Sequence, residues 1–113
     1  MTVQNDIHSI EVTIEQAKGQ IDNMQALDRL RKNKDFIKLL EDGYLKEEAS
    51  RLVLALAEPA LQSDENQRQL KKMIDGVGYF RQYLNKIYQF GHQSENAMAS
   101  HEATRTELMS EME

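Results

Sequence analysis

The chain contains no cysteine and no tryptophan, and only one of its 113 residues is proline. Without cysteine it can form neither disulfides nor thiolate metal sites, which suits a reducing compartment. One proline, five glycines and few β-branched residues argue against a β-sandwich or a β-barrel. These absences favour a helical protein.

Long apolar runs are absent as well. No stretch approaches the roughly 20 consecutive apolar residues that a membrane-spanning helix needs. The first residues, MTVQNDIHS, lack the basic flank and the apolar stretch of a signal peptide. We therefore expect a protein that is neither secreted through a signal peptide nor embedded in a membrane.

The net charge of −5 is concentrated near the end of the chain. Residues 91–113 carry five acidic side chains and one basic one, whereas residues 1–90 are nearly neutral. A nearly neutral body argues against broad nucleic-acid binding. The candidate contacts of the acidic tail with a partner are Glu102, Glu107 and Glu111.

Residues 6–32 carry a row of apolar side chains at alternating spacings of three and four. This period of 3.5 is typical of a coiled coil or of a helix packed lengthwise on another. An isolated helix would be marginal in water, so the row must be buried against residues 64–90 or in an oligomer. The candidate interface residues on it are Ile7, Ile10, Ile14, Ile21 and Met24.

Residues 34–57 contain two short helical patterns separated by Gly43. Asn33 or Asp35 can cap the first helix, and Gly43 stands where a left-handed residue would end it. The second helix is expected to end before Pro59. Its core-facing stripe is predicted to be Ala49, Leu52, Val53, Leu56 and Ala57.

Residues 64–90 form a second long amphipathic pattern, and Ser63 can cap it. Tyr79 and Tyr83 lie one turn apart and off its apolar face. Such a pair can anchor a protein interface or cover a neighbouring helix, and the sequence leaves both interpretations open.

The expected fold is therefore all-α. Two long helices, residues 6–32 and 64–90, are joined by a helix-turn-helix hub at residues 34–57. We expect residues 1–90 to form a single helical domain. Residues 91–113 are expected to form an acidic tail that is flexible or ordered by a partner.

A basic cluster lies between the first two helical patterns. Its members are Arg29, Arg31, Lys32, Lys34 and Lys38. They can bind phosphate, but cations near a helix C-terminus also complement the helix dipole, and we favour that interpretation. Glu47 and Glu48 would face phosphate if the helix after Gly43 entered a DNA groove, which argues against nucleic acid as a partner.

No arrangement of residues typical of catalysis is present. His8, His92 and His101 do not pair at helical spacing, and no HExxH motif occurs. The GVG string at residues 76–78 lacks the strand and lysine of a phosphate-binding loop. We therefore predict a non-enzymatic protein without metal or cofactor.

Two strings, KDFIKLLEDGYLKEEASRLVLALAEPALQS and ENQRQLKKMIDGVGYFRQYL, resemble small helical proteins of tailed bacteriophages that are encoded among virion-assembly genes. The resemblance covers about residues 33–84. It implies a viral accessory protein located in the host cytoplasm or in the virion, and it carries over no catalytic residue.

Three functional hypotheses follow. The first is a virion structural or assembly factor that binds a protein partner, or its own copies, through helical faces. The second is an inhibitor or adaptor that binds a host protein through the acidic tail and the helical surface. The third and weakest is a nucleic-acid-binding helix-turn-helix protein.

Overall fold

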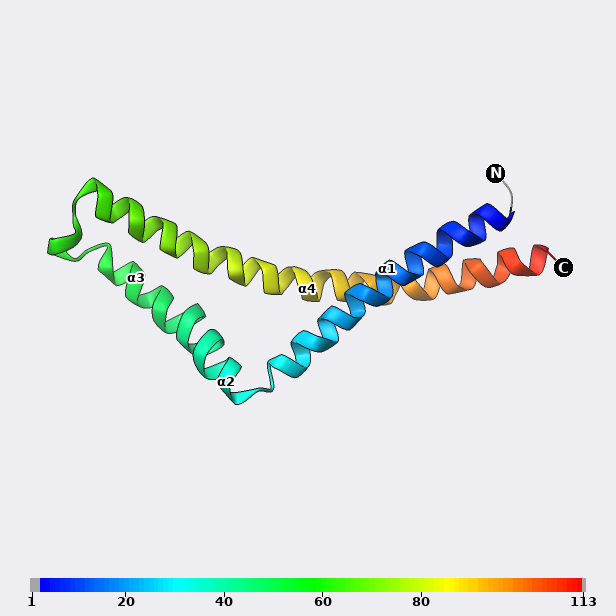
Figure 1. The fold of residues 1–113 in the computed structure, drawn as a ribbon, viewed down its shortest axis with the longest axis horizontal. Coiled ribbons are helices and arrows are strands. Elements are labelled where there is room, and N and C mark those ends of the chain that lie inside the picture. The colour runs from blue at the N-terminus through cyan, green and yellow to red at the C-terminus, as the bar shows by residue number, and fades with distance from the viewer. Residues whose placement is uncertain (1–2, 113) are drawn as a thin grey trace. The chain divides into compact units, whose positions relative to one another are not determined.

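The computed structural model describes residues 3–112, and the side chains of Ile10, Val12 and His101 lie outside the described part. All elements in this range are helical (Figure 1). In chain order they are α1 (Val3–Leu30), α2 (Lys34–Phe36), the π-helix η1 (Ile37–Glu48), α3 (Ala49–Ala55), the 3-10 helix η2 (Pro59–Leu61) and α4 (Asp64–Glu111). The predicted all-α fold with two long helices is confirmed.

The chain divides into two compact units. Unit 1 consists of residues 1–27 and 86–113, and unit 2 consists of residues 28–85. Helix α4 contributes its second part to unit 1 and its first part to unit 2. The expected division at residue 90 stays a prediction, but α4 itself continues without a break from Phe90 into Gly91.

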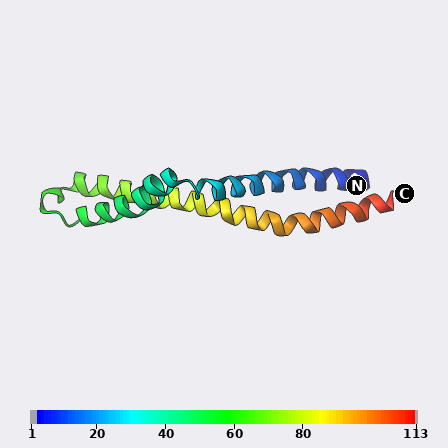
Figure 2. The same cartoon turned by 90° about the horizontal axis from the view of Figure 1, so that it is seen from below.

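Unit 1 is an antiparallel helix pair. Met24 of α1 lies against Gly91 of α4, and Gln20, one turn earlier, meets Ser94. The residue number of the contact rises along α4 as it falls along α1. The two helices therefore run in opposite directions, as Figures 1 and 2 also show. The core residues that α1 supplies are Ile14, Ala17, Met24 and Leu27.

The second long helix extends well beyond the expected end at residue 90. It reaches Glu111, and both Gly91 and Ser94 are buried against α1. The physical reason lies in α1, whose apolar row needs a covering surface and finds it on this part of α4. The polar composition of residues 91–113 did not predict that they pack against α1. Small residues such as Gly91 and Ser94, rather than large apolar ones, form this contact.

The middle helix, formed by α2, η1 and α3 in succession (residues 34–55), begins where the sequence predicts. The Asn33 side chain accepts hydrogen bonds from the backbone N–H groups of Asp35 and Phe36, at 2.9 and 3.1 Å. These bonds satisfy two of the N–H groups that a helix start leaves unpaired. Asn33 is therefore the N-cap, and the alternative, Asp35, is not.

The predicted corner at Gly43 is wrong. Gly43 lies inside η1, and no glycine in residues 3–112 has a positive φ. In a π-helix the backbone hydrogen bonds join residues five apart, and a Cβ on Gly43 would stand 2.9 Å from the carbonyl oxygen of Lys38. Gly43 therefore provides room for a wide helical turn instead of ending a helix.

Unit 2 pairs the middle helix with the first part of α4. Leu52 is 1% exposed and packs with Leu70 and Val77 of α4. Towards the other end of the middle helix, the rings of Tyr44 and Phe80 meet edge to face at 5.8 Å. The contacts again run in opposite directions along the two helices, so this pair is antiparallel too.

The connection between α3 and α4 is stabilised by hydrogen bonds from a side chain to backbone carbonyl oxygens. Gln67 donates hydrogen bonds to the carbonyl oxygens of Leu56 and Leu61, at 3.1 and 2.8 Å. These bonds satisfy carbonyls that the helix ends leave open. As predicted, α3 ends before Pro59.

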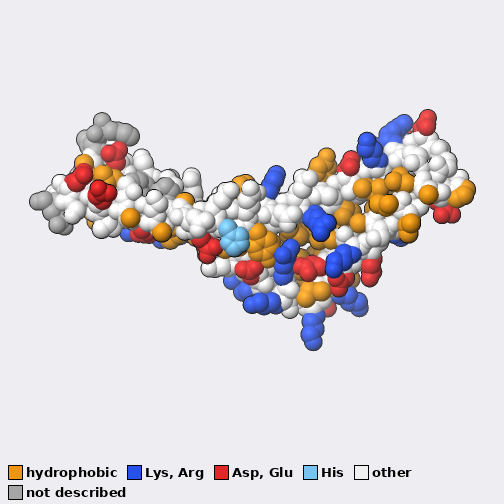
Figure 3. Space-filling model, turned by 180° about the vertical axis from the view of Figure 1, so that it is seen from behind, with side chains coloured by type: hydrophobic (Ala, Val, Ile, Leu, Met, Phe, Trp, Pro, Cys, Tyr) orange, Lys and Arg blue, Asp and Glu red, His pale blue; other side chains and the backbone are white. Residues whose placement is uncertain are grey.

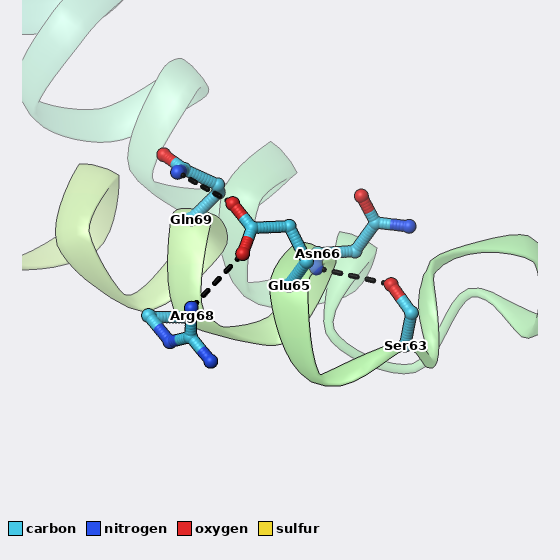
Figure 4. A network of polar contacts seen from close by, with 5 residues as sticks. All are labelled: Ser63, Glu65, Asn66, Arg68 and Gln69. Carbon is cyan, nitrogen blue, oxygen red and sulfur yellow. Dashed lines mark hydrogen bonds and ion pairs between the residues drawn. The ribbon is translucent and has the colours of Figure 1, made fainter.

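Ser63 caps α4, as the sequence predicts. Its hydroxyl accepts a hydrogen bond from the backbone N–H of Asn66 at 3.1 Å (Figure 4). The carboxylate of Glu65, in the first turn, accepts hydrogen bonds from Arg68 and Gln69 at 2.9 and 3.1 Å. A carboxylate in the first turn also interacts favourably with the helix dipole.

Candidate functional site

The predicted interface on α1 is covered within the chain. Ile14 is 2% exposed and Met24 is buried in unit 1, while Ile7 and Ile21 are half-buried. The side chain of Ile10 lies outside the described part. The row is covered within the same chain, but by the part of α4 within residues 86–113, most of which lies beyond the predicted partner segment 64–90. A contact of these residues with a partner stays a prediction.

Tyr79 and Tyr83 of α4 form an exposed ridge on unit 2, which we call the tyrosine ridge. Their exposed fractions are 68% and 62%, whereas Val77 and Leu84 on the opposite side of α4 are buried. The interpretation that these tyrosines cover a neighbouring helix is therefore wrong. Phe80 instead makes the aromatic contact with the middle helix.

The outer side of the middle helix also exposes large apolar side chains. Leu54 is 73% exposed, and Leu39 and Val53 are exposed as well. Hydrophobic side chains gather over α3, η2 and the start of α4, at the right of Figure 3. Val53 was predicted to face the core. It does not, because burial is limited to the narrow side of α3 that carries Leu52, Ala49 and Leu56.

The basic cluster consists of four exposed cations and one that is ion-paired, and two of the exposed ones, Lys34 and Lys38, line the same hollow. Arg29, Lys32, Lys34 and Lys38 are exposed. Arg31 is half-buried and forms an ion pair with Glu41, with 2.9 Å between its Nε and the Glu41 Oε1. Arg31 is thus paired with an acid, Glu41, that the sequence did not single out.

The acidic residues of the expected tail lie along α4. Glu102 forms an ion pair with Arg105 at 2.9 Å, and both side chains are partly exposed. Glu107 and Glu111 are exposed. Binding of a partner through these carboxylates stays a prediction.

Within residues 3–112, His8 and His92 join no group of three or more acidic or histidine residues that could hold a metal ion. His92 instead lies 3.2 Å from the carboxylate of Glu95 and stacks on Tyr88. None of the described helices combines the length and apolarity needed to cross a membrane.

The candidate surfaces are therefore the tyrosine ridge and the exposed apolar side chains Leu39, Val53 and Leu54. No protein-family model matches the chain, and no curated protein or solved structure matches it.

Proposed function

We propose that this chain is a non-enzymatic interaction protein that binds a protein partner through the tyrosine ridge. The observation that carries the proposal is the exposure of Tyr79 and Tyr83 on a helix whose other side is anchored in the core of unit 2. Tyrosine is enriched among residues that dominate binding energy, because its ring supplies apolar area and its hydroxyl a hydrogen bond. A ridge on an anchored helix loses little conformational freedom when it binds.

The neighbours of the ridge extend it into a stripe along α4. Lys72, Tyr79 and Tyr83 follow one another at spacings of seven and four, so they share one side of the helix. Lys72 is exposed at one end of the stripe. An aromatic centre beside a charged residue resembles the composition of protein interfaces, which have an apolar core and a polar rim.

The biological setting is a further part of the proposal. The resemblance of residues 33–84 to small helical proteins of tailed bacteriophages supports a role as a virion structural or assembly factor. Tyr79 and Tyr83 both fall within the resembling region. The partner would then be another virion or assembly protein, or a second copy of the chain.

The experiment compares the wild-type chain with a Tyr79→Ser/Tyr83→Ser double variant. Affinity purification with cross-linking from the cells that produce the protein would identify the partner, and light scattering would report self-association. We expect the double variant to bind at least about tenfold more weakly, since each interface tyrosine can contribute more than about 1.4 kcal/mol.

The matched control is Leu54→Ser, which removes an equally exposed apolar side chain from the same unit. Circular dichroism should show the same melting curve for all three proteins. A double variant that retains every partner and the same oligomeric state as the wild type would disprove the proposal.

A further inference from the structure

Unit 2 contains a hollow that is not lined by the tyrosines of the tyrosine ridge. It has a volume of about 430 Å³. Arg31 lies on one side, Glu41, Leu45 and Lys46 of η1 on a second, and Arg81, Leu84 and Asn85 of α4 on a third. This size is in the usual range for pockets that bind small molecules.

The charges around the hollow are mostly positive. Arg31, Lys46 and Arg81 contribute three cations, and Glu41 contributes the single carboxylate. That carboxylate is already engaged by Arg31 at 2.9 Å. Arg81 is exposed, and no hydrogen bond or ion pair joins it to another residue within the described range.

The cations differ in how firmly they are held. The Arg31–Glu41 pair is partly buried, so the guanidinium of Arg31 is kept in place at the wall. Lys46 has only a surface contact, 3.5 Å from Asp42, which contributes little stability and leaves the ammonium available. The hollow thus combines a positioned cation with two that can turn towards a ligand.

The wall formed by η1 is unusual in its backbone. Long π-helices are rare, and π-helical turns occur frequently at functional sites. The wide turn places Glu41, Leu45 and Lys46, which are four and five residues apart, on the same side of the helix. Gly43 permits this geometry because its position has no room for a Cβ atom.

We infer that this hollow binds a small organic oxyanion, a phosphate ester or a carboxylate attached to an apolar body. Guanidinium groups match such anions because their N–H donors form paired hydrogen bonds to two oxygens. Leu45 and Leu84 would contact the apolar body, and the Asn85 amide can donate a further hydrogen bond. The site is independent of the tyrosine ridge.

The test is an NMR titration of the full-length, ¹⁵N-labelled chain with phenyl phosphate, benzoate and inorganic phosphate in turn. We expect saturable shifts of the Arg81 Nε–H and Asn85 side-chain amide signals, with phenyl phosphate binding more tightly than inorganic phosphate. Tighter binding of phenyl phosphate than of benzoate would identify a phosphate ester as the ligand, and the reverse order a carboxylate.

Two variants make the test specific. Arg81→Gln removes a cation at the hollow and should weaken binding about tenfold. Arg68→Gln removes an exposed arginine that is paired with Glu65 elsewhere on α4, and it should leave the affinity unchanged. Absence of saturable shifts up to about 10 mM, or equal weakening by both variants, would overturn the inference.

Discussion

Gly91 of α4 lies so close to Met24 of α1 that a Cβ atom at residue 91 would stand 2.5 Å from the Met24 Cβ and 2.6 Å from its sulfur. Distances this short are not tolerated between real atoms, so the two helices can approach each other here only because residue 91 is glycine. Gly91 is thus a point of close approach between α1 and α4.

Gly91→Ala should destabilise unit 1. The added methyl group meets the Met24 Cβ, which cannot move without its backbone, and overpacking of this kind costs about 1 to 3 kcal/mol. Chemical denaturation followed by circular dichroism would measure the loss. The matched control is Gly19→Ala in α1, where no atom lies within 4 Å and alanine should add up to about 1 kcal/mol of helix stability. Equal effects of the two substitutions would contradict the close contact.

Leu52→Ala should be among the most destabilising single changes in unit 2. Leu52 is 1% exposed and packs on Leu70 and Val77, and removal of such a side chain leaves a cavity that costs about 2 to 5 kcal/mol. Leu54→Ala, two residues later, should change the free energy of unfolding by less than about 0.5 kcal/mol because Leu54 is 73% exposed. Urea denaturation of both variants would measure the two changes in the free energy of unfolding. A larger effect at Leu54 would show that α3 packs through its other side.

Gly43→Ala should drive η1 out of its π-helical register. The new Cβ would stand 2.9 Å from the Lys38 carbonyl oxygen, and a shift towards the α-helical pattern of hydrogen bonds relieves this contact. Amide exchange and backbone NMR should show altered hydrogen bonding around residue 43, while the helix content seen by circular dichroism stays the same.

Gly78→Ala provides the control for this change. No atom lies within 4 Å of a Cβ at Gly78, so the substitution should leave the hydrogen bonds of η1 intact. If Gly43→Ala left the hydrogen bonds of η1 as unchanged as Gly78→Ala does, the π-helical turn would not depend on Gly43.

Glu48 should titrate at a lower pH than an ordinary glutamate. Arg51 donates hydrogen bonds to both carboxylate oxygens of Glu48, at 2.9 and 2.5 Å, and these bonds lower the pKa of Glu48. Because the pKa is lower in the folded chain, the stabilisation is present above the ordinary glutamate pKa and is lost as the pH falls through the lowered value. The effect on stability is small because the pair is exposed to solvent.

Carboxyl NMR titration of an Arg51→Met variant measures this effect directly. We expect the pKa of Glu48 to rise towards its ordinary value once the guanidinium is removed. Arg68→Met removes an arginine that is paired with Glu65, so it should leave the titration of Glu48 unchanged. The same Glu48 pKa in both variants would argue against the Arg51 contact in solution.

The sequence alone determined the helices and several of their ends. The row of Ile14 and Met24 predicted a helix packed along its length, Ser63 was predicted as a cap, and Asn33 was one of two candidate caps. Such features are local, because a cap joins residues two or three apart and an amphipathic pattern repeats within a few turns.

Only the tertiary structure decided what the glycines do and which side chains stay exposed. In the sequence, Gly43 stands where a helix would end and Gly91 is the first residue of the expected tail, yet Gly43 lies within a π-helical turn and Gly91 admits Met24. Likewise, Tyr79 could have covered a neighbouring helix, but Phe80 makes that contact. The physical reason is that glycine and tyrosine suit several environments equally well, and the choice depends on neighbours distant in the chain.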